Sequence, residues 1–274
     1  WQYVICHHFV CIEKNARSNY RAKRKYLQCC LWTRFNHRIY VFEIMLNLTH
    51  RSLHKEFLDE TNIPYDDVKL NMQELNTINT LLGGHRITLQ GFKQLLGQRT
   101  KLSVMEIGCG GGDNLKVIEA YCKKINIDVE LLGIDINQGI CQFAQQQNPQ
   151  IKVLCGDYRL LTLQTKPDIL FSSLFCHHFT DEELITQLQW MKNNARVGFF
   201  INDLHRNSMA YYSIKILTAL FSNSYLVKND APLSVARGFK KREWDFLFKK
   251  AGFLPYVVQW KWAFRHLIVY KHGA

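Results

Sequence analysis

The sequence predicts an α/β fold built on a mostly parallel sheet, and three observations support that prediction. Strand-like and helix-like segments alternate from Lys101 onward, one apolar strand runs into a glycine-rich turn, and the last two apolar runs lie close together. Alternation of this kind is typical of a parallel sheet with helices on both faces. The closing pair is too tightly spaced for a helical crossover and predicts an antiparallel hairpin.

Each element follows from a local pattern. Apolar runs predict strands at 102–107, 130–134, 151–155, 168–172 and 197–201, with the hairpin at 255–260 and 266–270. Helical spacing predicts helices at 113–124, 137–147, 181–193 and 241–251. An earlier helix, 65–82, has Val68, Met72, Leu75, Ile78 and Leu82 on one face. Gly83 and Gly84 would end that helix, and Thr88 would begin a short second one.

Composition restricts the class of protein. The 274 residues are 47% hydrophobic, enough for one domain with a helical appendage. No apolar run approaches the roughly 18 residues of a membrane span, and no secretory signal is visible. Nine cysteines without CxxC pairs indicate reduced thiols rather than zinc or disulfides. We therefore expect a cytoplasmic protein without a metal site.

The first 50 residues differ from the rest of the chain. They carry eight Lys/Arg against two acidic residues, so half of the net charge of +12 lies there. They show no sustained helical or strand period, and we expect residues 1–44 to be an extension of little function before a start at Met45. The predicted organisation is an unassigned extension (1–50), a helical cap (51–100) and a sheet domain (101–274) that includes a lid (207–239).

The stretch "VMEIGCGGGDNL" places a glycine turn behind a strand. A triphosphate loop needs Gly-Lys-Ser/Thr, but Asp113 follows Gly112 here. A dinucleotide fingerprint would need its third glycine at Asp113. Glu106, at the strand end, would repel a pyrophosphate but attract the amino group of a methionine moiety. The pattern therefore predicts a site for S-adenosylmethionine (SAM) and disfavours a nicotinamide oxidoreductase.

Acidic residues also end the next two predicted strands. Asp135 could accept hydrogen bonds from ribose hydroxyls, and Asp157 from an adenine amino group that Tyr158 flanks. Ligands of open α/β sheets bind at these carboxyl ends. The predicted cofactor-binding residues are Glu106, Gly108, Cys109, Gly110, Gly112, Asp135, Ile136, Asp157, Tyr158 and Ser172.

From about Leu102 onward the chain resembles class I SAM-dependent methyltransferases, with "MEIGCGGGDN", "GIDIN", "CGDY" and "DILFSSLFCHHF" in the expected order. It looks most like the small-molecule branch that includes ubiquinone and menaquinone methyltransferases. "INTLLGGHR", "INDLHR" and "DAPLSVARGF" are similar to segments of bacterial methyltransferase-domain proteins of aromatic polyketide or quinone-type metabolism. The resemblance implies a Rossmann-like sheet of seven strands and methylation of a small aromatic or quinone-like, lipophilic metabolite.

The predicted acceptor side follows the fourth strand. His178 is the preferred proton acceptor, ahead of His177, with support from Asp203 and the region of His205. Zinc is disfavoured, because adjacent Cys176, His177 and His178 would diverge in extended backbone. A packing role for either histidine stays open.

Further predictions concern the lid and the partners. Tyr211, Tyr212, Leu217 and Phe221 could face a flat substrate, or could simply be core. Arg237 could pair with a carboxylate, and Trp260 and Trp262 should be structural. A lipophilic substrate would permit transient contact with a membrane surface. Nucleic-acid methylation is the alternative that the basic charge allows, but the Asn/Asp-Pro-Pro-aromatic turn of amino-group base methylases is absent. A non-catalytic SAM-binding protein is the other alternative.

Overall fold

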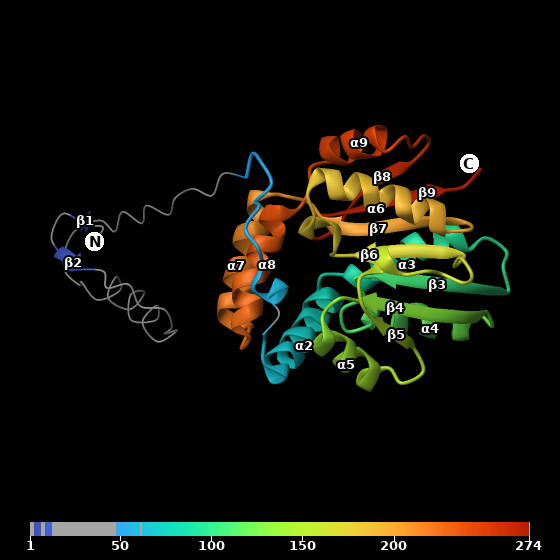
Figure 1. The fold of residues 1–274 in the computed structure, drawn as a ribbon, viewed down its shortest axis with the longest axis horizontal. Helices are drawn as coiled ribbons and strands as arrows, with labels where there is room; N and C mark the ends of the chain where they lie inside the picture. The colour runs from blue at the N-terminus through green and yellow to red at the C-terminus, as the bar shows by residue number, and fades with distance from the viewer. Residues whose placement is uncertain (1–2, 7–8, 13–47, 61, 274) are drawn as a thin grey trace. The chain divides into compact units, whose positions relative to one another are not determined.

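A computed structural model describes residues 3–6, 9–12, 48–60 and 62–273 (Figure 1). The chain divides into two units, Trp1–Leu46 and Asn47–Ala274. In the first unit, β1 (Tyr3–Cys6) and β2 (Phe9–Ile12) pair antiparallel, a hairpin that the sequence pattern does not predict. Met45 and most of the predicted extension lie outside the described residues.

The second unit is built on the predicted seven-stranded sheet, in the order β5-β4-β3-β6-β7-β9-β8. Its parallel strands are β3 (Lys101–Ile107), β4 (Asp128–Asp135), β5 (Lys152–Cys155), β6 (Ile169–Ser173) and β7 (Gly198–Leu204). The predicted terminal hairpin is confirmed, since β8 (Val257–Lys261) and β9 (Arg265–Lys271) pair antiparallel and β9 joins β7 in the same sense.

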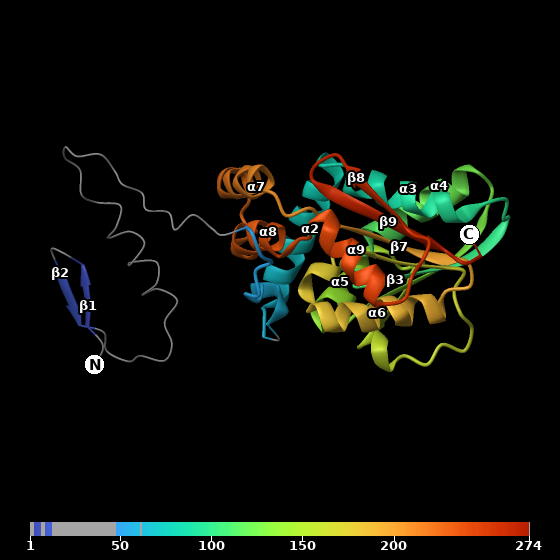
Figure 2. The ribbon, with the colours of Figure 1, turned by 90° about the horizontal axis from the view of Figure 1, so that it is seen from above.

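Helices cover both faces of this sheet, because successive side chains of each strand point to opposite faces. Leu102 and Val104 of β3 pack with α3 (Gly84–Leu96) and α4 (Asp113–Lys124). Met105 and Ile107 pack with α6 (Asp181–Asn194) and α9 (Lys241–Lys250) on the other face. Figure 2 shows α3 and α4 on one side of the strands and α6 on the other. The remaining helix of the alternating region is α5 (Gln138–Gln147).

The structure corrects the boundary of the second helix. Gly83 has φ +72° and ends α2 (Tyr65–Leu81) as predicted, but α3 begins at once at Gly84. Thr88 therefore lies inside α3, buried, where its hydroxyl accepts a hydrogen bond from Asn202. The helix packs on the sheet, and a Cβ at Gly91 would lie 2.5 Å from the ring of Phe200. Of the two helices expected as a cap, α2 lines the cavity described below along several turns, and α3 reaches it through His85.

Two further segments complete the unit. The region after β7 forms α7 (Ser208–Phe221) and α8 (Tyr225–Arg237), at the place predicted for a lid. Residues 48–60, which we call the strap, have no helix except the short 3-10 turn η1 (Phe57–Asp59). The strap lies against α8 in both views (Figures 1 and 2). None of the helices in the described part of the chain is long and apolar enough to cross a membrane.

Candidate active site

One large cavity, of about 1220 Å³, opens at the carboxyl ends of β3, β4 and β6. The glycine turn and the residues after β4 and β5 line one part of it. The rest is lined by α2, α7, α8 and the strap, together with the turn after β6, His85 of α3 and the β8–β9 turn. This position is where open α/β sheets bind ligands. The structure thus brings the predicted histidines and all of the predicted cofactor residues except Gly112 and Ser172 to a single cavity.

Glu106 is fully buried at the end of β3, and only one of its carboxylate oxygens is satisfied. Its Oε1 accepts a hydrogen bond from Asn114 Nδ2 at 2.9 Å, while Oε2 has no partner in the described structure. Burial, opposed by the Asn114 contact and reinforced by the charges of Asp113 and Asp135, raises its pKa well above the ordinary value. A buried polar atom without a partner is costly and indicates that a ligand belongs there.

The glycines beside Glu106 have distinct roles. Gly108 has φ +66°, and a Cβ there would lie 2.1 Å from the ring of Phe175. Gly110 has φ +52°, and a Cβ would meet nothing nearer than Met72 Sδ at 3.9 Å, so the space above it is free for a ligand. Gly112 caps α4 in the left-handed region and does not line the cavity, contrary to its predicted contact with the cofactor.

Asp135 lies at the carboxyl end of β4, and backbone groups hold its carboxylate in place. Oδ2 accepts from the amide of Gly110 and Oδ1 from the amide of Asn137, both at 3.1 Å. Burial nevertheless raises its pKa. Next to it, Ile136 is 69% exposed at the cavity wall, where it offers an apolar surface to a flat ring.

Three predicted cofactor residues at the ends of β5 and β6 have contacts that the sequence did not predict. The Asp157 carboxylate is already paired with Arg159, with 2.6 Å between Oδ2 and Nη2. Tyr158 is buried and packs edge-on against Trp190. Ser172 is fully buried beside Cys176 and does not line the cavity, so its neighbour Ser173 takes the place predicted for it.

The side chains of His177 and His178 lie side by side. The backbone expected from the sequence is extended here, and adjacent side chains would then point apart. Residues Cys176–His178 form a 3-10 turn, and the two imidazole centroids are 4.4 Å apart. His177 Nδ1 is 2.8 Å from Asp203 Oδ1. Asp203 therefore supports His177, whereas the prediction assigned it to His178. His205 packs against His266 instead.

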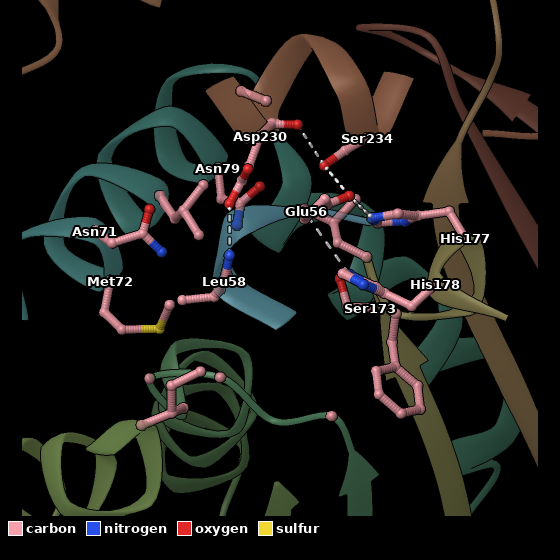
Figure 3. Close-up of a pocket in the computed structure, with 18 of the residues that line it drawn as sticks. Glu56, Leu58, Asn71, Met72, Asn79, Ser173, His177, His178, Asp230 and Ser234 are labelled. Carbon is pink, nitrogen blue, oxygen red and sulfur yellow. Dashed lines mark hydrogen bonds and ion pairs between the residues drawn. The ribbon is translucent and has the colours of Figure 1, made fainter. Parts of the chain in front are cut away.

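Glu56 and Asp59 of the strap complete this cluster, and sequence reasoning missed both. Figure 3 shows Glu56 pointing toward the two rings. Its Oε1 is 3.4 Å from His177 Nε2, and its Oε2 is 3.8 Å from His178 Nε2. Asp59 Oδ1 is 2.9 Å from His178 Nδ1. The strap has no period that reveals an inward face, and the only signal was the three acidic residues of "KEFLDE" before the first helix.

These contacts shift the pKa values of three groups in the cluster. Burial alone would lower the pKa of His177, but Asp203 and Glu56 outweigh it and raise the pKa to about 9. Burial alone would likewise raise the pKa of Asp59, but the hydrogen bond and charge of His178 lower it to about 2. The same two imidazoles lower the pKa of Glu56 despite its burial.

Arg237 pairs with a carboxylate as predicted, since its Nη1 is 3.4 Å from Asp59 Oδ2, whereas Trp262 and three of the four lid residues differ from expectation. The buried Arg237 guanidinium donates to the carbonyl oxygens of His177 and His178, which fixes the histidine turn. Trp262, expected to be structural, is 74% exposed and lines the cavity. Of the four lid residues suggested for substrate, only Leu217 lines it. The α7 face toward the cavity consists of Met209, Ala210, Ser213, Ile214 and Leu217.

The site has the features that SAM requires. The unpaired oxygen of Glu106 suits an ammonium group, the open space at Gly110 suits a ligand close to the backbone, and Asp135 suits ribose hydroxyls. These groups belong to three consecutive elements, β3, the glycine turn and β4. The donor set therefore fits SAM as predicted.

Comparisons with known proteins agree with this geometry. Residues 104–218 match the family model described as "Methyltransferase domain". The structure is similar to the plantazolicin methyltransferase BpumL in complex with SAH, with 16% identity, a TM-score of 0.55 and coverage of 73% of this chain and 89% of that one. It is also similar to human N-acetylserotonin methyltransferase in complex with SAM, with 16% identity, a TM-score of 0.53 and coverage of 77% and 57%. No curated protein sequence matches the chain.

Proposed function

We propose that this SAM-dependent methyltransferase transfers a methyl group to a small, aromatic or quinone-like lipophilic metabolite. The observation that carries the proposal is the buried Glu106, whose free oxygen faces the same cavity as the histidine cluster. The structurally similar enzymes are named for plantazolicin and for N-acetylserotonin. Neither name refers to a nucleic acid, which supports a small acceptor here.

The size and lining of the cavity support a substantial acceptor. At about 1220 Å³ it exceeds the roughly 300–1000 Å³ of ordinary ligand pockets, so a cofactor would leave room for a second molecule. Met72, Leu75 and Ile78 of α2 line it opposite Ile214 and Leu217 of α7. Such walls favour a flat apolar body, and the few polar groups near the histidines would orient its reacting end.

The outer face of α7 supports a lipophilic acceptor as well. Ile216, Leu220 and Phe221 are 58%, 70% and 77% exposed, on the same helix that forms the cavity wall. Apolar side chains at the rim of a cavity could contact a membrane surface while a lipophilic substrate enters. Transient contact of this kind remains part of the proposal.

Residues of the chain supply orientation and a proton acceptor. Bound SAM supplies a methyl group on a positively charged sulfur, a leaving group that needs no acid. Glu106, Asp135 and the glycine turn would hold the cofactor, and orientation alone can contribute roughly 7–11 kcal/mol. A phenol has a pKa of about 10 and gains from a base.

His178 is the proton acceptor that the geometry favours. Both ring nitrogens of His177 are enclosed by carboxylates, and its side chain is 2% exposed. The side chain of His178 is 22% exposed and lines the cavity, and Asp59 holds its Nδ1. A carboxylate on Nδ1 fixes the ring so that Nε2 presents its lone pair. The preference for His178 from the sequence therefore stays a proposal, with Asp59 in place of Asp203 as its partner.

The test is methyl transfer from labelled SAM to a panel of phenols and quinols, measured on metal-free protein. His178→Ala should lower turnover by about 10²–10⁴-fold if the base matters, with SAM affinity unchanged. His54→Ala, an exposed histidine on the same strap, should change neither. An effect below tenfold, at a pH where the acceptor is not ionised, would leave His178 only a packing role. Failure of SAM to bind in calorimetry, or tighter binding of NADH, would remove the enzyme class itself.

A further inference from the structure

Glu56, His177 and His178 form a cluster of metal-binding groups, of which the proposed methyl transfer uses only His178 as a proton acceptor. The carboxylate oxygen and the two imidazole nitrogens lie within 4.8 Å of one another, and Glu56 and His177 are buried. The three side chains come from two segments about 120 residues apart, the strap and the turn after β6. We infer that these three residues bind one divalent transition-metal ion at the wall of the cavity.

The orientation of the rings supports a metal site. Each histidine uses Nδ1 for a carboxylate, Asp203 at 2.8 Å for His177 and Asp59 at 2.9 Å for His178. Each turns Nε2 toward a different oxygen of Glu56. Metal-binding histidines characteristically have this arrangement, in which a carboxylate on one ring nitrogen fixes the ring and raises the basicity of the other.

The donor atoms lie within 4.8 Å of one another, so the three side chains would have to move closer together to bind one ion. An ion bound at about 2.0–2.2 Å by nitrogen and oxygen, with tetrahedral angles, separates its ligand atoms by roughly 3.4 Å. His177 Nε2 and Glu56 Oε1 are already 3.4 Å apart, and His178 Nε2 is 3.8 Å from Oε2. Two imidazoles and one carboxylate suit zinc and its first-row neighbours, and three protein ligands leave a position open to the cavity.

The surrounding charges include groups that favour the ion and groups that oppose it. Asp59 and Asp203 add two carboxylates next to the histidines. Arg237 opposes the ion, with Nε 4.0 Å from Glu56 Oε1, although the guanidinium also donates to two backbone carbonyls of the histidine turn. Arg51 also lies nearby, with Nη2 3.3 Å from the carbonyl oxygen of His177. The three carboxylates of Glu56, Asp59 and Asp203 outnumber these two guanidinium groups, so a divalent cation is accommodated.

The inference does not depend on the proposed methylation. An ion would occupy the lone pair of His178 Nε2, so the metal-loaded protein could not use His178 as the proton acceptor. A hydroxyl bound to the ion would instead lose its proton more readily. Metal binding is therefore measured directly, and turnover is measured separately on the metal-free and the metal-loaded protein.

The experiment is calorimetric titration of the chelator-treated full-length protein with Zn²⁺, together with the visible absorption of bound Co²⁺. The wild type should bind one more ion than His178→Ala and Glu56→Gln, or bind it at least tenfold more tightly. Asp59→Asn should weaken the same event by about 10–100-fold, because outer carboxylates contribute that much to metal affinity. His54→Ala is the matched control and should bind like the wild type.

Other histidines and cysteines of the chain can bind zinc, so the result lies in the difference between variants. Melting temperature and SAM affinity show that each variant is folded; the half-exposed His178 gives the decisive variant if Glu56→Gln does not fold. Equal stoichiometry and affinity in wild type and His178→Ala would overturn the metal site. That result would leave SAM binding and methyl transfer untouched, whereas loss of SAM binding alone would leave the metal site intact.

Discussion

Glu106 is a residue whose chemistry conflicts with its surroundings in the free protein. Its carboxyl is fully buried, makes one side-chain hydrogen bond and has a raised pKa. Local conflicts of this kind are concentrated at functional sites, where a ligand resolves them. An ammonium group at the free oxygen would supply both the missing hydrogen bond and the missing opposite charge.

We expect Glu106→Gln to lower SAM affinity by about 10–100-fold, because a hydrogen bond between buried charged groups contributes roughly 1.5–3 kcal/mol. The same change should raise the melting temperature of the ligand-free protein, since an amide has no ionised form to desolvate. Calorimetry with SAM and thermal unfolding without it measure the two effects. Weaker binding accompanied by lower stability would indicate a structural role for Glu106.

The raised pKa of Glu106 also predicts a pH dependence. A group whose pKa is higher in the folded state stabilises the fold below its unfolded pKa, and that contribution is lost as pH rises through the folded value. The ligand-free protein should therefore lose stability toward higher pH, while SAM affinity rises as the carboxyl ionises. Titrations across the acidic to neutral range should show this slope in the wild type and not in Glu106→Gln.

Gly110 combines a left-handed backbone conformation with free space beside its Cα, and a larger side chain would affect both. Gly110→Val should abolish measurable SAM binding, because the side chain would fill the open space above the turn. Its left-handed φ should also cost about 1–2 kcal/mol of stability. Gly252→Val is the matched control, since Gly252 has φ +78° and free space but does not line the cavity. Normal SAM binding by folded Gly110→Val would refute the assignment of the glycine turn.

At the scale of elements, the strap is held by interactions that a linear pattern does not reveal. Buried Arg206 donates to the carbonyl oxygens of Leu48 and Thr49 and pairs with Glu243. Asp230 of α8 accepts hydrogen bonds from the amides of Phe57 and Leu58 at 2.8 and 3.0 Å. The contacts of Arg206 and Asp230 with the strap join residues more than 150 positions apart and place Glu56 at the histidines.

Parts of the site on regular strands could be predicted from the sequence, whereas parts on the strap could not. Glu106 and Asp135 end regular strands, so the fold alone determines where they lie. The partner of His178 comes from an irregular segment positioned by tertiary contacts, and hydrophobic periodicity contains no information about it. Thr88 was misjudged for a related reason, because a hydroxyl that suits a helix start also suits a buried hydrogen bond to Asn202.

We expect Asp230→Ala to lower both stability and turnover while leaving SAM affinity within about twofold of the wild type. Two strap amides would lose a partly buried acceptor, at about 1–3 kcal/mol for each unsatisfied group. Asp128→Ala is a control at an exposed ion pair with Lys101, where the expected effect is at most about 1 kcal/mol. If turnover is unchanged, the strap does not position the acceptor site.

At the scale of the whole molecule, the matched domain is completed by segments outside it. The family match spans residues 104–218, but Glu56 and Asp59 precede it, and the α8 residues that hold the strap follow it. The half of the cavity that we propose for the cofactor therefore lies within the matched domain. The half that would hold the acceptor depends on additions at both ends, where substrate specificity can vary without altering the cofactor site.

The strap and the residues before it are expected to contribute differently to the stability of the domain. A chain that starts at Met45 should keep the melting temperature and SAM affinity of the full chain, because Trp1–Leu46 form a separate unit. A chain that starts at Asn62 loses the strap, so Arg206 and Arg237 lose backbone acceptors. At about 1–3 kcal/mol for each buried group left unsatisfied, its melting temperature should fall by about 5 °C or more, and turnover should be lost. Thermal unfolding and SAM titration of both chains provide the measurement; a loss in the chain starting at Met45 would mean that the first 44 residues contribute to the domain.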